Sequence, residues 1–152
     1  MLLRMWLFVS VVLAALVAGM FFAPWVALTR SMKTFTPETF LAVVKRLNLN
    51  MAPAMTVLMP LALLSMVPVL WLSYRALPGV FYSTTAGFTL FVVALLVTML
   101  VEMPIVKQID TWTVATLPES WEQLRDRWGA FHLVRIVAGG LGFGLLLAGA
   151  LL

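Results

Sequence analysis

The sequence predicts an all-α protein: an integral membrane four-helix bundle with a short amphipathic interfacial helix and a Trp-rich loop helix. Hydrophobic residues make up 63% of the 152 residues and charged residues only 11%, and the mean hydropathy is +1.07. A soluble domain of this size could not bury so much apolar surface. No linker or internal repeat divides the chain, so we expect one four-span transmembrane domain over residues 1–152.

Four apolar stretches are long enough to cross a bilayer, whose hydrocarbon core of about 30 Å needs roughly 20 apolar residues in a helix. They are residues 2–28, 51–72, 80–101 and 131–152. The first run exceeds the apolar core of a secretory signal, about 7–15 residues, so we expect a span rather than a cleaved signal. Prolines inside the first two spans predict bent helices. These prolines are Pro24, Pro53, Pro60 and Pro68.

The connection between the first two spans contains a helix start at Thr36-Pro37-Glu38. The hydroxyl can cap the helix, proline suits the first helical position, and the acid suits the positive first turn. Apolar residues then recur at three- and four-residue spacing, which predicts a short amphipathic helix lying in the membrane interface. These residues are Phe40, Val43, Val44 and Leu47.

The third connection is longer and rich in tryptophan. The run from Ser120 to Gln123 has the spacing of a capping box and predicts a loop helix. One apolar stripe follows and leads into the fourth span. It consists of Trp121, Leu124, Trp128 and Phe131. An interfacial belt is the favoured role for the tryptophans of this connection, with stacking partners as the alternative. The ten methionines of the chain are interpreted as packing residues.

Lysine and arginine gather on one side of the predicted bundle. The first and third connections hold Arg30, Lys33, Lys45, Arg46, Lys107, Arg125 and Arg127, whereas the opposite side has Arg4 and Arg75. Because basic residues favour the cytoplasmic face, these two connections should be cytoplasmic and both termini outside, in a bacterial inner membrane. The net charge of +4 therefore indicates a lipid bilayer as the partner, and we expect no nucleic acid.

The fourth span is rich in glycine. Gly140, Gly144 and Ala148 have the small-xxx-small spacing that lets helices approach closely. Packing inside the bundle is the favoured interpretation. The alternative is a self-association face, which would make the protein a homo-oligomer.

Ionisable residues near the ends of the third and fourth spans form the candidate site. A charge near the bilayer centre costs about 2.5–3.5 kcal/mol even on the lenient insertion scale. Antiparallel helices joined by one loop would bring Glu102, His132 and Arg135 to similar depth, with Asn48 and Asn50 at the same end. Glu102 and Arg135 are either a structural ion pair or part of a functional site. His132 is either a general base or a hydrogen-bonded fixture.

The residue inventory narrows the chemistry. With one histidine and no cysteine, the chain cannot build an ordinary zinc, copper or bis-histidine haem site. It also has no phosphate-binding glycine loop and no dinucleotide fingerprint. We therefore expect an enzyme, if it is one, to work without a tightly held metal or cofactor.

A series of motifs between Glu102 and Arg135 resembles a known family. The motifs are Glu102-Met-Pro-Ile, Ile109-Asp110-Thr111-Trp112, Leu117-Pro118, Trp121, Arg125-Asp126-Arg127-Trp128 and Phe131-His132-Leu-Val-Arg135. They are similar to those of the small four-helix membrane proteins that include the fungal anthrone oxygenases. Helix number and loop length also agree over the first hundred residues. The chain departs from the family at Val106, where an asparagine is often found.

The resemblance implies oxidation of an activated phenolic or polycyclic carbon by molecular oxygen without metal or flavin. It implies His132 as the base, Glu102 as its orienting or charge-tuning partner and Arg135 as the clamp for an oxyanion or phenolate. Trp128 and Trp112 would wall a hydrophobic aromatic substrate, with Asn48 and Asn50 as further contacts. The competing prediction is a non-catalytic helical subunit or scaffold. Secondary transport is a third reading with little support, because the chain has no repeat or paired broken helices.

Overall fold

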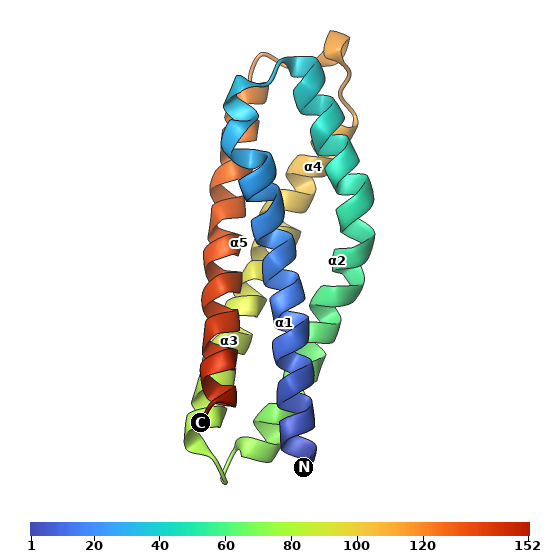
Figure 1. The fold of residues 1–152 in the computed structure, drawn as a ribbon. Coiled ribbons are helices and arrows are strands. Elements are labelled where there is room, and N and C mark those ends of the chain that lie inside the picture. The colour runs from blue at the N-terminus through green and yellow to red at the C-terminus, as the bar shows by residue number, and fades with distance from the viewer.

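The structure, a computed structural model describing residues 1–152, consists of four long helical rods without strands (Figure 1). The elements are α1 (Leu2–Ala27), η1 (Thr29–Thr34), α2 (Pro37–Ser73), α3 (Pro78–Val97), η2 (Thr98–Glu102), α4 (Met103–Asp110), η3 (Val114–Thr116) and α5 (Trp121–Ala150). The third rod is continuous from α3 through η2 into α4. Four helices are long and apolar enough to cross a membrane. The predicted fold class, an all-α integral membrane four-helix bundle, is therefore confirmed.

The rods form a closed ring in which each packs against two neighbours. α1 contacts α2 and α5, and α3 contacts the same two helices from the other side. The N- and C-termini lie at one end of the bundle, and η1 and the connection before α5 lie at the other, here called the loop end (Figure 1). Neighbouring rods are therefore antiparallel, as short connections between successive spans require.

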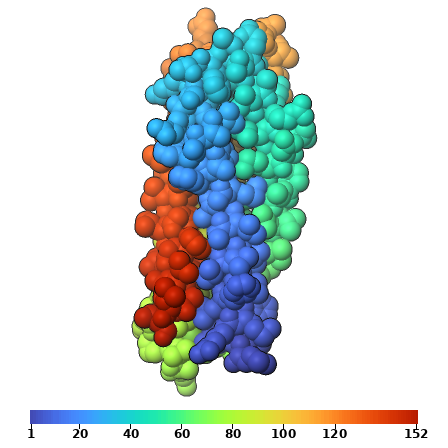
Figure 2. All heavy atoms as spheres, in the orientation of Figure 1, coloured from blue at the N-terminus to red at the C-terminus, as the bar shows by residue number.

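The outer surface of the bundle is apolar along its length. Figure 2 shows an elongated molecule whose visible face is formed by α1, α2 and α5. Large hydrophobic side chains point outward from all four rods, such as Phe8, Leu64, Leu100 and Leu141. A soluble monomer rarely exposes so much continuous apolar surface, whereas lipid tails solvate it without cost. This surface is that of an integral membrane protein.

The predicted interfacial helix is the first part of α2 and not a separate element. Its start is as expected, because the Thr36 hydroxyl accepts a hydrogen bond from the Thr39 backbone N–H at 3.4 Å. The helix then continues without interruption to Ser73. Phe40 and Val44 are buried against residues of α4 and α5. The apolar stripe thus packs on protein and not on lipid headgroups, and this packing holds the segment in line with the span.

The predicted Trp-rich loop helix is likewise the first part of α5. Ser120 is the N-cap residue, but its side chain makes no capping hydrogen bond, so the predicted capping box is wrong. A capping box occurs instead at η3, where the Thr113 and Thr116 side chains and backbones bond reciprocally. The helix continues because Trp128 packs into a core at the loop end.

Three buried clusters hold the rods together. The largest fills the middle of the bundle and includes Val17, Phe21, Met66, Phe91 and Leu146, and the smallest consists of Leu7, Val69 and Val80. The loop-end core consists of Met32, Phe40, Leu41, Val44, Ile105, Val106, Ile109, Trp112 and Trp128. The predicted helix-internal prolines are present in α1 and α2, and α2 bows outward around its middle (Figure 1). Proline causes such bends because it removes a helix hydrogen bond and crowds the preceding turn.

The glycines of α5 that pack inside the bundle are not the ones of the predicted stripe. Gly140 and Gly144 have no neighbouring atom within 4 Å of a Cβ position, and Ala148 is exposed. The close helix contacts are made by Gly139, against Phe21, and by Gly142. The favoured interpretation of the predicted stripe, packing inside the bundle, is therefore wrong.

We expect Gly87→Ala to destabilise the bundle although alanine favours helices. A Cβ at Gly87 would lie 2.9 Å from the Gly142 carbonyl oxygen and 3.1 Å from Leu146 Cγ. Because backbone cannot yield as a flexible side chain can, α3 and α5 must separate, at a cost of about 1–3 kcal/mol. Thermal unfolding in detergent measures the loss. The control Gly144→Ala meets no atom and should gain about 0.5–1 kcal/mol; equal effects would contradict the packing argument.

Candidate active site

Glu102 is placed in the bundle interior by a widened helical turn. In η2 the backbone N–H of Met103 bonds to the carbonyl of Thr98, five residues earlier, as in a π-helix. Pro104 follows and has no N–H to continue the regular ladder. The turn exposes Leu100 to the outside and buries Glu102, which is 3% exposed. Single π turns of this kind often occur at functional sites.

The Glu102 carboxylate pairs with the Arg135 guanidinium across η2 and α5. The carbon of that guanidinium also lies 4.3 Å from the centre of the Phe21 ring. The ion pair that the sequence left open is thus present, and Arg135 is held from two sides. At this depth each charge needs an oppositely charged partner, because burying either ion alone would cost much free energy.

His132 lies beside this pair without a hydrogen bond to it. Its Nδ1 is 3.6 Å from Glu102 Oε1, which is beyond ordinary hydrogen-bond length. The imidazole is stacked on Trp128, with ring centres 5.2 Å apart and planes inclined by 7°. The stack fixes the plane of the ring.

Several polar atoms of this group have no hydrogen-bond partner in the protein. They are both ring nitrogens of His132, Oε1 of Glu102 and Nε of Arg135. Buried polar atoms are almost always paired, and exceptions call for an explanation. A polar ligand group between these side chains would satisfy them.

These atoms border a cavity of about 450 Å³ between the largest buried cluster and the loop-end core. Small-molecule sites typically have volumes of about 300–1,000 Å³ and a mainly apolar lining with few polar groups. The lining consists of Met20, Pro24, Val44, Leu47, Asn48, Met51, Ala52, Met55, Thr56, Met59, Pro60, Leu95, Thr98, Met99, Glu102, Met103, Val106, Trp128, His132 and Arg135. The cavity therefore combines an apolar wall with one acidic, one basic and one imidazole side chain.

The structure brings five of the seven predicted site residues to the cavity. Asn48 lines it, with its amide donating to the Asp110 carboxylate at 3.2 Å. Asn50 is exposed and outside the lining. Trp112 is buried in the loop-end core, where its carbonyl accepts a bond from Lys45. The structure therefore does not bring Asn50 and Trp112 to this cavity.

Methionines form much of the cavity wall, and sequence reasoning did not single out the individual residues. Met51, Met55 and Met59 of α2 all line it. Their four-residue spacing places them on one face of α2, next to three prolines of the same helix. This pattern indicates an apolar face with flexible side chains. Methionine adapts its shape to irregular space and favours contact with aromatic rings.

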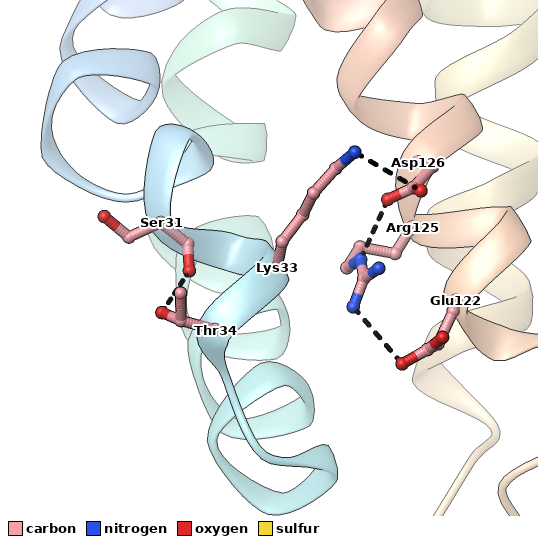
Figure 3. Close-up of polar contacts among 6 residues, drawn as sticks. All are labelled: Ser31, Lys33, Thr34, Glu122, Arg125 and Asp126. Atoms are coloured by element: carbon pink, nitrogen blue, oxygen red, sulfur yellow. Dashed lines mark hydrogen bonds and ion pairs between the residues drawn. The ribbon is translucent and has the colours of Figure 1, made fainter.

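A series of ion pairs connects η1 with α5 at the loop end (Figure 3). Lys33 Nζ lies 3.7 Å from Asp126 Oδ2, and Arg125 donates from Nε to Asp126 Oδ1 at 3.0 Å. Arg125 also approaches Glu122 at 3.8 Å and lies over the Trp121 ring. Arg125 lies seven residues before His132 on α5, but its charge is compensated here and it does not line the cavity.

The cavity supplies one imidazole and one carboxylate, and the chain has no group of three or more His, Cys, Asp or Glu side chains suited to a metal ion. A family model described as Anthrone oxygenase matches residues 40–145, which include Glu102, His132 and Arg135. No curated protein and no solved structure shows a significant match.

Proposed function

The chain belongs to the anthrone oxygenase family, and we propose that it is a membrane-embedded oxygenase acting on an anthrone-like phenolic substrate with O₂, without metal or flavin. The observation that carries the proposal is the unpartnered imidazole of His132 beside the Glu102–Arg135 pair in an apolar cavity. This arrangement suits an aromatic substrate whose polar edge meets these three side chains.

Each side chain has a role that its contacts support. His132 acts as general base, with its ring plane fixed by Trp128. Arg135, held by Glu102 and Phe21, presents a fixed cation to a phenolate or oxyanion. Glu102 orients Arg135 through the ion pair and places its negative charge beside His132, whose Nδ1 lies 3.6 Å from Oε1. Trp128 and Asn48 contribute to the wall.

The reaction converts a CH₂ group between two aromatic rings into a carbonyl, using one O₂ and forming one H₂O. His132 takes a CH₂ proton, and the carbanion, delocalised over the ring system, transfers electrons to O₂ to form a C–O bond. The peroxide anion takes the proton back from the imidazolium. His132 then removes the second C–H proton; the carbonyl forms as the O–O bond breaks, and the leaving hydroxide takes that proton as water. All four electrons come from the substrate, so no other reductant is needed.

Oxygen consumption by the purified protein tests the proposal. Anthrones, hydroquinones and related phenols are screened, and an accepted anthrone should use one O₂ per molecule. With ¹⁸O₂, one labelled oxygen should appear in the new carbonyl and the other in water. Chelator-treated protein should react at an undiminished rate. Loss of activity on metal removal, or no substrate oxidation across the screen, would contradict the proposal.

A non-catalytic role is the second candidate, and the Glu102–Arg135 pair favours it as a clasp between η2 and α5. Under that role the protein is a small helical membrane subunit. Substitutions in the pair would then change stability, and no phenolic compound would be consumed.

We further propose that the protein lies in a bacterial inner membrane with the loop end in the cytoplasm. The chain has no cysteine, so single cysteines report position directly. In intact cells, an impermeant maleimide should label Arg75→Cys and spare Arg46→Cys and Arg127→Cys, all three positions being exposed, because basic residues favour the cytoplasmic side. Permeabilised cells should label all three. Labelling of Arg127→Cys but not Arg75→Cys in intact cells would reverse the orientation.

A further inference from the structure

The exposed residues of the cavity lining all lie on one side of the bundle. The lining residues on α1 and α5 are buried or nearly so, including Pro24, Trp128 and His132. The exposed lining residues are Thr56 and Pro60 of α2 and Met99 of η2, which is 59% exposed. We call the opening between α2 and η2, framed by Thr56, Pro60 and Met99, the lateral portal.

The lateral portal lies within the membrane-spanning part of the bundle. Thr56 and Pro60 are in the middle of α2, which is among the helices able to cross a membrane. The exposed neighbours Val57 and Leu61 on α2 and Leu100 on η2 are apolar. Since such surface faces lipid tails, the portal opens to the bilayer and not to water.

The loop end of the cavity is closed by packed side chains. The loop-end core lies between the cavity and the connections, and Phe40 and Ile109 in it are 1% exposed. Lys45 adds a bond to the Trp112 carbonyl at 2.7 Å across the same end. A ligand from the cytoplasm would have to separate this core, whereas a ligand in the bilayer meets an opening.

The shape of α2 explains why the opening is there. Pro60 has no N–H, so the Thr56 carbonyl lacks its usual helix partner, and Pro53 has the same effect about two turns earlier. α2 bows outward around its middle (Figure 1), so the side of the cavity that α2 forms lies farther from η2. On the other side of the portal stands Met99, an unbranched flexible side chain.

We infer that the substrate reaches His132 from the bilayer through the lateral portal, and that it is therefore a flat, lipophilic ring system that dissolves in the membrane. This inference rests on the proposed function for the identity of the ligand. The route follows from exposure and depth: the ligand passes between Thr56 and Met99 with its phenolic edge leading, toward Arg135 and His132. Its apolar remainder then contacts the methionines of α2.

The route can be tested without turnover. Met59 lines the cavity and is 4% exposed, so Met59→Cys provides an inner target in a chain without other thiols. In proteoliposomes, membrane-dissolved N-pyrenylmaleimide should modify it, and a charged methanethiosulfonate should not. Adding Met99→Trp should slow the maleimide reaction by about tenfold or more, a barrier change of about 1.4 kcal/mol. Leu100→Trp, at the adjacent exposed position outside the lining, should leave the rate unchanged.

Thr56→Trp and its neighbour Val57→Trp repeat the comparison from the α2 side, so misfolding of one variant does not decide the result. Slowing by Met99→Trp and Thr56→Trp with unchanged rates in both controls supports the portal. Rapid modification by the charged reagent, or equal rates in portal and control variants, would overturn it. The labelling result does not depend on oxygen consumption, so failure of the oxygenase assay alone would contradict the proposed function and leave the route standing.

Discussion

Replacing His132 with glutamine should remove most of the oxidation of an accepted substrate while leaving the bundle folded. Glutamine retains hydrogen-bonding groups of similar reach but cannot take a proton from carbon. General-base catalysis typically contributes about 10²–10⁴-fold to the rate, so the loss of kcat should have that size. Oxygen consumption and carbonyl formation, measured on protein that stays monodisperse in detergent, give the comparison.

A matched control separates the loss of a base from the loss of any buried polar group. Thr84 of α3 is buried and its hydroxyl has no partner, as with His132, but it lies outside the cavity. Thr84→Val should therefore keep full activity. If His132→Gln remained fully active, His132 would not be the base, and the polar group would act as a clasp between helices.

The spans and the central polar group could be predicted because each depends on local sequence. An uninterrupted apolar run long enough to cross the bilayer has one favourable state in lipid, a helix. Because one loop joins the third and fourth spans, Glu102, His132 and Arg135 had to lie at similar depth once those spans were antiparallel. The ion pair itself follows from the cost of leaving either charge alone.

Features that depend on packing between rods could not be predicted. Nothing at Asn48 or Asn50 stops or requires a helix, so the continuity of α2 was decided by contacts of Phe40 and Val44 with distant residues. Similarly, Gly139 and Gly140 are adjacent in sequence, and only the rotation of α5 decides which one meets Phe21.

The cavity belongs to the same category. Its existence depends on how far the prolines of α2 move that helix away from η2, and its chemistry depends on the π-helical turn that directs Glu102 inward. An apolar run predicts a span directly. No comparable sequence pattern predicts how far α2 bends or where a π-helical turn occurs. The sequence thus predicted which polar residues meet, and the structure adds the space beside them.

Neutralising either member of the Glu102–Arg135 pair should destabilise the protein strongly, and neutralising both should cost less than the sum of the two. Removing one partner from a buried ion pair typically costs about 3–5 kcal/mol, because the remaining charge is left without compensation. Glu102→Gln should be the more damaging change, since a guanidinium cannot lose its proton, whereas Glu102 can take one up or turn toward His132, 3.6 Å away. Thermal unfolding in detergent of Glu102→Gln, Arg135→Gln and the double variant measures the coupling.

Arg135→Lys is the informative companion, because it retains the charge but loses the planar group that lies over Phe21 and pairs with Glu102. If charge alone stabilises the pair, lysine should recover most of the stability lost in Arg135→Gln. If the fork geometry is required, it should recover little. Strictly additive losses in the double-mutant cycle would mean that the two side chains do not interact. A coupled cycle together with unchanged oxygen consumption in Arg135→Gln would confine Arg135 to holding η2 against α5 and remove it from the proposed chemistry.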